Sequence, residues 1–212
     1  MSTTAALAAL LLGGLIAPQT ASATNGSGGS AALTNARQGA AAAPAPGPQA
    51  AGSVRMSDTA ASAQLLQIRA VHSGKCMDVQ GASPSNGADV FQWDCLSSTQ
   101  YNQQWYLEIN SDGIMRVRAA HSGKCLDVQG ASHKDAANVF QWDCLADTYR
   151  NQRWFLANER VQNGRYTYNI IAQHSGKCLD VAGASHLNGA NVFQWTCLGD
   201  DQLNQRWSFH VV

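Results

Sequence analysis

Carboxylate, indole and amide side chains recur three times along this chain in the same order. Each unit holds a Cys-x-Asp-Val segment, then Phe-Gln-Trp-x-Cys, then Asn-Gln-x-Trp, and its opening His-Ser-Gly-Lys-Cys segment returns after 49 and then 53 residues. The residues that could do chemistry are the aspartates Asp78, Asp127 and Asp180, the tryptophans Trp93, Trp142 and Trp195, and the pairs Asn102/Gln103, Asn151/Gln152 and Asn204/Gln205. A threefold internal repeat therefore organises the chain.

Together these side chains suit one kind of ligand, a pyranose sugar. The C–H face of a pyranose is apolar and packs on an aromatic ring, whereas its hydroxyls need directed donors and acceptors. A carboxylate accepts hydrogen bonds from neighbouring hydroxyls, and an amide both donates and accepts. A purely structural interpretation also exists, because the aspartates can stabilise turns and the tryptophans can be partly covered rim residues.

Short β-strands must position these side chains. Residues 114–119 and 166–172 are strand-like segments bounded by turn formers, and Asp112-Gly113 and Asn163-Gly164 mark hairpins. No segment shows a sustained helical period of apolar residues. Three such units predict an all-β body with approximate threefold symmetry. Its large core residues should be Trp105, Trp154 and Trp207, and we expect His72, His121 and His174 to be structural.

The repeated Gln-x-Trp, Cys-Leu-Asp-Val and Trp-x-Cys motifs resemble those of a ricin B-type lectin domain, also classed as a family 13 carbohydrate-binding module, of the secreted, actinobacterial-like kind. The resemblance covers residues 64–212. It implies a β-trefoil of twelve strands with threefold pseudo-symmetry and one potential sugar pocket per repeat. The repeats span about 64–110, 111–158 and 159–212.

The resemblance also implies roles for the repeated residues. The aspartate accepts bonds from two sugar hydroxyls, the tryptophan before the second cysteine is the stacking platform, the asparagine binds the sugar, and the glutamine helps to fix the aspartate. Galactose- or xylose-type units are the expected ligands. Many family members carry Gln two residues before the platform, but this chain has Phe91, Phe140 and Phe193 there. The neighbouring Gln92, Gln141 and Gln194 face the other side of the strand, which removes one polar contact per pocket.

The three repeats are not equivalent. Thr196 stands where the other repeats have Asp94 and Asp143, and Ala182 replaces Gln80 and Gln129. The second repeat has Asp135-Ala136 where the others have Asn86-Gly87 and Asn188-Gly189.

The six cysteines fall in pairs 19 residues apart within each repeat. Six cysteines allow fifteen pairings. The symmetry favours Cys76–Cys95, Cys125–Cys144 and Cys178–Cys197 as disulfides. Zinc is the alternative, because His72-x-x-x-Cys76 recurs, but structural zinc sites usually have ligand pairs two to four residues apart, and such pairs are missing here. We therefore expect no metal and no cofactor.

The N-terminal third has a different composition. Residues 1–23 have the apolar run and small residues of a secretory signal peptide, although residues 1–4 lack Lys and Arg. Residues 24–63 are rich in Gly, Ala, Ser, Pro and Thr, which predicts a disordered linker. We therefore expect a secreted, extracellular protein with one folded domain at 64–212.

The balance of basic and acidic residues argues against strongly anionic partners. Fourteen Lys and Arg balance fourteen Asp and Glu, so a nucleic-acid partner is disfavoured, as is an anionic membrane surface. The apolar run is also too short for membrane insertion, which needs about 20 residues. We expect a monomer whose partner is a polysaccharide or glycan.

Non-catalytic carbohydrate binding through up to three weak sites is the function that the sequence predicts. An enzyme is disfavoured because every candidate acid is repeated threefold, which fits binding sites better than one catalytic centre. The alternative is a protein-interaction trefoil, such as a protease inhibitor or a toxin-type binding subunit, because a fold does not determine function.

Overall fold

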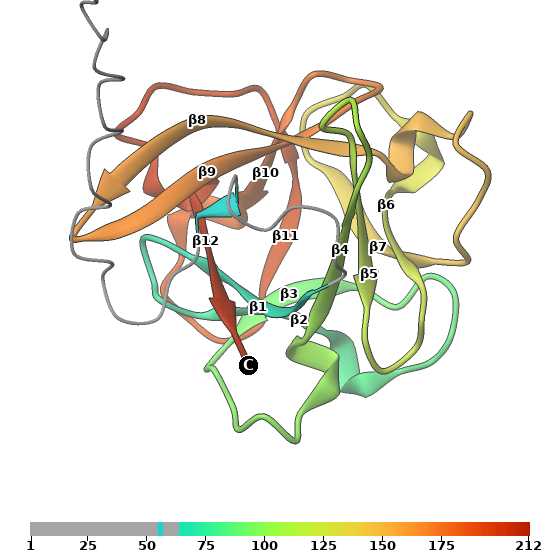
Figure 1. Ribbon diagram of the computed structural model, residues 1–212, viewed down its shortest axis with the longest axis horizontal. Helices are drawn as coiled ribbons and strands as arrows, with labels where there is room; N and C mark the ends of the chain where they lie inside the picture. The colour runs from blue at the N-terminus through green and yellow to red at the C-terminus, as the bar shows by residue number, and fades with distance from the viewer. Residues whose placement is uncertain (1–54, 57–63) are drawn as a thin grey trace, which may run out of the picture. The chain divides into compact units, whose positions relative to one another are not determined.

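The computed structural model describes residues 55–56 and 64–212, whose regular structure consists of β-strands and single turns of 3-10 helix (Figure 1). The strands are β1 Gln64–Ala70, β2 Cys76–Val79, β3 Val90–Trp93, β4 Trp105–Ile109, β5 Met115–Ala119, β6 Cys125–Val128, β7 Ala137–Trp142, β8 Trp154–Gln162, β9 Arg165–Ala172, β10 Cys178–Val181, β11 Ala190–Trp195 and β12 Trp207–Val211. The helical turns are η2 Gln80–Ala82, η3 Tyr101–Gln103, η4 Gln129–Ala131, η5 Arg150–Gln152, η6 Ala182–Ala184 and η7 Leu203–Gln205. Nothing in the described part of the chain is a helix long and apolar enough to cross a lipid bilayer.

Six strands close into an antiparallel barrel. β1 pairs with β4 and β12, β4 with β5, β5 with β8, β8 with β9, and β9 with β12. The pairing of β1 with β12 sets Leu66 opposite Val211 and completes the ring. Figure 1 shows β8 and β9 running side by side as the longest strand pair. A closed ring of strands leaves no free sheet edge along the barrel.

Three hairpins, one from each repeat, form the second part of the fold. They are β2–β3, β6–β7 and β10–β11, and all three have the same register. β11 also pairs with both β3 and β7, so the hairpins join one another around the pseudo-threefold axis. A six-stranded barrel with three hairpins is a β-trefoil, and the predicted all-β class and threefold symmetry are confirmed.

Three tryptophans fill the centre of the fold. Trp105, Trp154 and Trp207 open the barrel strands β4, β8 and β12 and are fully buried, as predicted. Each indole N–H donates to a backbone carbonyl in the hairpin of its own repeat, at 3.0 Å to Met77, 3.1 Å to Leu126 and 3.0 Å to Leu179. A buried indole needs such a partner, so each tryptophan ties a hairpin to the barrel.

The six cysteines form three disulfides, Cys76–Cys95, Cys125–Cys144 and Cys178–Cys197, and the predicted pairing is confirmed. Each bridge links the start of one hairpin strand to the residues just after the platform tryptophan. The sulfurs are therefore engaged in covalent bonds, which overturns the zinc alternative. Each bridge closes a loop of about 20 residues, which contributes roughly 3 kcal/mol in the chain-entropy account.

Side chains lock the repeats to one another in a cycle. Gln92 of the first repeat donates to the carbonyls of Ser185 and Leu187 in the third, and His72 Nε2 donates to Ser185 at 2.9 Å. In the same way, Gln141 and His121 of the second repeat donate to the Ser83 carbonyl of the first. Gln194 and His174 of the third repeat donate to the Ser132 carbonyl of the second. The three histidines are thus structural, as expected, and the three glutamines face away from the platform side.

Arg55 and Met56 pack against the domain, although they fall in the range 24–63 for which we predicted a disordered linker. Arg55 forms an ion pair with Glu159, and the Met56 N–H donates to the Tyr168 hydroxyl. Met56 is 8% exposed and belongs to the hydrophobic core. The remainder of the predicted linker and the predicted signal peptide lie outside the described residues.

Candidate functional site

In each hairpin the aspartate and the platform tryptophan project from the same face. Asp78 on β2 lies opposite Phe91 on β3, and Cys76 lies opposite Trp93. Directly opposed residues share a face, and side chains two positions apart on a strand point the same way. The same register places Asp127 with Trp142 and Asp180 with Trp195. The structure therefore places the carboxylate and the indole of each repeat on one surface, as the ligand chemistry requires.

The platform tryptophans differ from the core tryptophans in exposure. Trp93, Trp142 and Trp195 are 38%, 39% and 36% exposed, whereas the three core indoles are fully buried. A phenylalanine flanks each platform, with ring centroids 5.7 Å apart for Phe91 and Trp93. The half-exposed indole is thus held by its neighbour and still offers a face to solvent, which is what stacking on a sugar needs.

Two amides hold each carboxylate in place. In the first repeat Asn102 Nδ2 donates to Asp78 Oδ1 at 2.9 Å, and Gln103 Nε2 donates to Asp78 Oδ2 at 2.8 Å. The other repeats copy these bonds within 0.1 Å. Each carboxylate oxygen can accept more than one hydrogen bond. The aspartate is therefore fixed in orientation and keeps acceptor capacity for sugar hydroxyls.

The glutamines are positioning residues. Gln103, Gln152 and Gln205 are fully buried. Gln103 Nε2 also donates to the Asp94 carbonyl, and its Oε1 accepts the Leu96 N–H at 2.8 Å. Both ends of the amide are thus used, and the glutamine ties the aspartate to the turn after the platform. The asparagines differ, because Asn102 uses its Nδ2 on Asp78 and Val79 and leaves its carbonyl oxygen for a ligand.

In the second repeat the site residues line a cavity of about 560 Å³. Asp127, Trp142 and Asn151 line it, as the sequence predicted, and Phe140 lines it between them on β7. Its other walls come from residues that sequence reasoning missed, namely Gly87 and Asp89 of the first repeat, Gln129–Ala131, Leu145 and Tyr149. Gln129 has no counterpart side chain in the third repeat, where Ala182 takes its place.

Two of the three platforms lie beside a glycine of the neighbouring repeat, whereas the second repeat has Ala136 at the corresponding position. A methyl group on Gly87 would lie 3.8 Å from the Trp142 indole, and one on Gly189 would lie 3.9 Å from the Trp93 indole. Both glycines have φ of 80°, a conformation that glycine adopts readily. The Asn-Gly pairs that distinguish the first and third repeats therefore lie beside the platform of the next repeat, a placement that only the long-range packing reveals.

A clasp of polar side chains holds these pairs in place. Asn86 Nδ2 donates to Asp143 Oδ2 at 2.7 Å, and the Asp143 N–H donates to Asn86 Oδ1 at 2.9 Å. Lys124 completes the clasp by pairing with Asp143 at 2.5 Å. Asn188, Asp94 and Lys75 form the same clasp between the third and first repeats.

At the third repeat the clasp still pairs a lysine with a carboxylate, but the carboxylate comes from the neighbouring repeat. Thr196 replaces the platform-side aspartate, and Asp135 of the second repeat replaces the loop asparagine. The Thr196 N–H donates to Asp135 Oδ1 at 2.7 Å, and Lys177 pairs with Asp135 at 2.7 Å. The Lys177 ammonium, which donates to Asp135, holds the pKa of that carboxyl below its usual value. Thr196 and Asp135, which differ from the matching residues of the other repeats, thus compensate for each other.

We expect Thr196→Asp alone to lower the melting temperature, because it sets a second carboxylate against Asp135 beside a single lysine. Combining it with Asp135→Asn recreates the clasp of the other repeats and should restore the melting temperature. A double-mutant cycle measures this coupling. Additive effects of the two substitutions would show that the clasp is not a unit.

The pocket aspartates have perturbed titration. Burial raises the pKa of Asp78, Asp127 and Asp180 above the ordinary value, and the Gln and Asn donors oppose the shift only in part. The cause is that a desolvated carboxylate is less stable in its charged form. These groups therefore take up protons at a higher pH than an exposed aspartate does.

Ligand binding through these carboxylates should consequently weaken as the pH falls through their raised pKa, starting above the usual aspartate range. Protonation of the same groups favours the folded state, because their folded pKa lies above the unfolded one. Their contribution to stability therefore grows as the pH falls, opposite to the trend in binding. Calorimetric titration from about pH 7 to about pH 4, with circular dichroism at each pH, separates the two effects. Binding that does not change with pH over that range would exclude the aspartates as acceptors of hydrogen bonds from the ligand.

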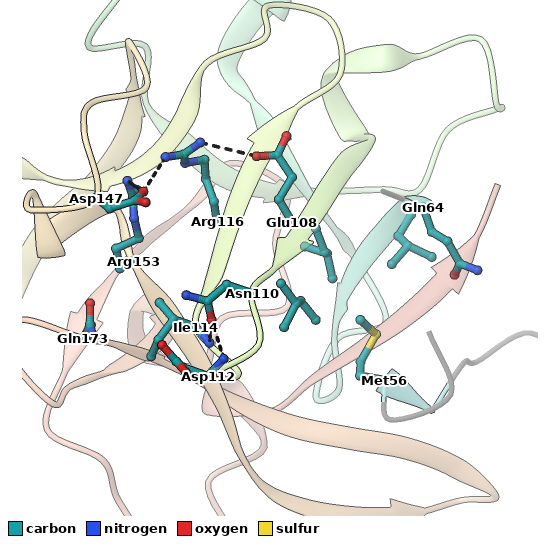
Figure 2. A pocket seen from close by; sticks show the side chains of 13 residues that line it. Met56, Gln64, Glu108, Asn110, Asp112, Ile114, Arg116, Asp147, Arg153 and Gln173 are labelled. Carbon is teal, nitrogen blue, oxygen red and sulfur yellow. Dashed lines mark hydrogen bonds and ion pairs between the residues drawn. The ribbon is translucent and has the colours of Figure 1, made fainter. Parts of the chain in front are cut away.

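A second hollow, of about 490 Å³, lies among β1, β4 and β5 (Figure 2). Figure 2 shows Arg116 between Glu108 and Asp147 on one wall and Met56 with Gln64 on the other. It contains none of the predicted site residues and no aromatic side chain. Its ion pairs already satisfy most of its charged groups. The hollow therefore lacks the stacking surface that a sugar needs.

Comparison with known proteins agrees with this geometry. The family model of the ricin-type β-trefoil lectin domain matches residues 64–207. The designed 3-fold symmetric protein ThreeFoil is 42% identical, with a TM-score of 0.61 over 70% of this chain and 99% of its own. An exo-β-1,3-galactanase from Clostridium thermocellum is 28% identical, with a TM-score of 0.62 over 71% of this chain but only 31% of its own.

The C-half of the earthworm R-type lectin, whose structure is a complex with GalNAc, shares the fold at 20% identity and a TM-score of 0.53, over 70% of this chain and 99% of its own. The family match extends over all three repeats, with their aspartates, platforms and Gln-x-Trp motifs. The chain therefore belongs to the ricin-type β-trefoil lectin family.

Proposed function

We propose that this protein is a non-catalytic lectin that binds polysaccharide or glycan through three weak sites acting together. The observation that carries the proposal is the same arrangement in three repeats, an aspartate fixed by two amides beside a half-exposed indole. The three indoles remain about 36–39% exposed, which leaves part of each available for stacking on a sugar.

The proposed binding mode follows from the three kinds of side chain in each site. The indole covers the apolar face of one pyranose, the aspartate accepts bonds from two adjacent hydroxyls, and the asparagine carbonyl accepts another. The carboxylate is nearly buried, at 4% exposure in each repeat, so its bonds to a ligand form in a partly desolvated setting. Charge-assisted bonds of this kind are stronger than neutral ones.

Galactose- or xylose-type units are the proposed ligands. The GalNAc complex of the earthworm lectin and the galactan substrate named for the Clostridium enzyme favour galactose-type units among the candidates. Phe91, Phe140 and Phe193 stand beside the platforms where many relatives carry an amide. Each pocket therefore has one polar contact fewer, and we propose that single sugars are held weakly and with modest selectivity.

Extracellular action as a monomer completes the proposal. Three disulfides are typical of proteins made in an oxidising compartment. The absence of catalysis is also a proposal. The aspartate of the Cys-x-Asp-Val segment recurs in all three repeats, which fits binding sites better than one catalytic centre, although Asp89 adds a second carboxylate to the lining of the second pocket. Reducing-end release from a bound polysaccharide would overturn it.

The test compares one sugar with its polymer. The full chain is titrated with galactose and with a β-1,3-galactan, and with xylose and a xylan, in parallel. Three sites on one rigid body should give the matching polymer about 100-fold or more tighter binding than its monomer, because later contacts become intramolecular. Equal affinity for sugar and polymer contradicts the multivalent proposal, and no binding to any polysaccharide on a broad glycan array contradicts the lectin proposal itself.

A further inference from the structure

The second repeat has an aromatic side chain at a position where the other two repeats have glutamine. Tyr149 lies two residues before Asn151, where the first and third repeats have Gln100 and Gln202. The backbone at this position is the same in all three repeats, with φ/ψ of −92/84°, −83/86° and −82/80°. The difference is therefore one of side chain alone.

Tyr149 lines the same cavity as Trp142 and Asp127. It is 52% exposed, and it is absent from the buried core of the domain. Tyr149 directly precedes η5, whose Asn151 donates to Asp127, whereas Trp142 ends the hairpin strand β7. Two partly exposed rings from separate segments thus line one pocket together with Asp127, the carboxylate that Asn151 and Gln152 hold in place.

A second ring changes what a pocket can hold. One indole offers one stacking surface, which suits one pyranose. A tyrosine adds an apolar ring with a hydroxyl that both donates and accepts, and it loses little side-chain freedom on binding. The cavity of about 560 Å³ falls within the range of sites that enclose ligands larger than a single sugar.

We propose that the second repeat is the principal site and that Tyr149 forms an added stacking subsite in it. This pocket then takes two adjacent units of a saccharide chain, whereas the first and third pockets each take one. The inference rests on the proposed lectin function and makes Tyr149 the residue that distinguishes an oligosaccharide from a monosaccharide.

The experiment isolates the second site with Asp78→Asn and Asp180→Asn in the full chain. Galactose and β-1,3-galactobiose, with xylose and xylobiose as a second pair, are titrated against this protein and against the same protein carrying Tyr149→Gln. We expect Tyr149→Gln to weaken disaccharide binding about 10-fold and to change monosaccharide binding less than about 2-fold. The control is Tyr101→Gln, an equally exposed tyrosine one position along in the first repeat, which should change neither.

A gain of function provides the converse test. In a protein with Asp78→Asn and Asp127→Asn, only the third site remains, and Gln202→Tyr should strengthen its disaccharide binding about 10-fold. Equal effects of Tyr149→Gln on monosaccharide and disaccharide, or no effect on either, overturn the subsite. Loss of all binding in the Asp78→Asn/Asp180→Asn protein, while the native chain still binds, overturns the primacy of the second site. If the native chain itself binds no saccharide, it is the lectin proposal that fails.

Discussion

A chain with Asp78→Asn, Asp127→Asn and Asp180→Asn together should bind polysaccharide roughly 100-fold more weakly than the native chain, or not at all. Both oxygens of each native carboxylate accept an amide N–H. An asparagine in that place must turn its own NH2 group toward one of these donors, so one bond is lost in either orientation. The charge that strengthens bonds to sugar hydroxyls is lost as well.

The readout is adsorption to insoluble polysaccharide, with thermal unfolding measured on the same samples. Because the aspartates are nearly buried, the triple variant can also lose stability. A second variant, Trp93→Ala, Trp142→Ala and Trp195→Ala, removes the half-exposed platforms and should abolish adsorption, and its thermal unfolding shows whether the variant is still folded. Retained adsorption by a folded platform variant would falsify sugar stacking. A protein partner that still binds both variants would favour the protein-interaction alternative.

Replacing Arg206 with Met should lower the free energy of unfolding by about 3 kcal/mol. Arg206 is 1% exposed, and its Nη2 donates to the carbonyls of Asn158 and Thr167 at 2.7 and 2.8 Å. Its Nε and Nη2 also donate to Thr167 Oγ1. Methionine fills similar space but leaves these buried acceptors without a donor, and each such loss is destabilising.

Arg206 matters because it closes an irregular part of the barrel. The β8–β9 pairing shifts register between Ala157 and Arg160, and Asn158 has φ of 54° there. Arg206, just before β12, binds across this bulge. Urea unfolding measures the effect, and Arg150→Met, at an exposed arginine, is the control that should change stability by less than about 0.5 kcal/mol. A comparable loss in both variants would mean that the bulge does not depend on Arg206.

The sequence was sufficient for the fold because each repeat carries its own local signals. The Gln-x-Trp tryptophans were predicted as core and the Trp-x-Cys tryptophans as exposed platforms, and the burial of Trp154 and the exposure of Trp142 agree with both. The constant cysteine spacing gave the disulfides, because symmetry left one sensible pairing. Within a repeat, the strand period of two was enough to place Gln92 on the opposite face from Phe91 and Trp93.

The walls between repeats could not be predicted in the same way. Gly87 contacts Trp142 across 55 positions of sequence, and no local pattern encodes that contact. Thr196 and Asp135 looked like two separate departures because they lie in different repeats and meet only in the folded chain. Tyr149 belongs to no repeated motif, because the matching positions hold Gln100 and Gln202.

The loop that a neighbouring repeat contributes to a pocket has a consequence for genetic mapping. A substitution at Asn86 or Gly87 alters a segment of the first repeat, yet the proposed sugar site that it disturbs is that of Trp142 in the second. Binding defects will therefore appear in the pocket of the repeat that follows the one carrying the substitution. A screen that scores defects by the nearest motif in the sequence would assign each lesion to the wrong pocket.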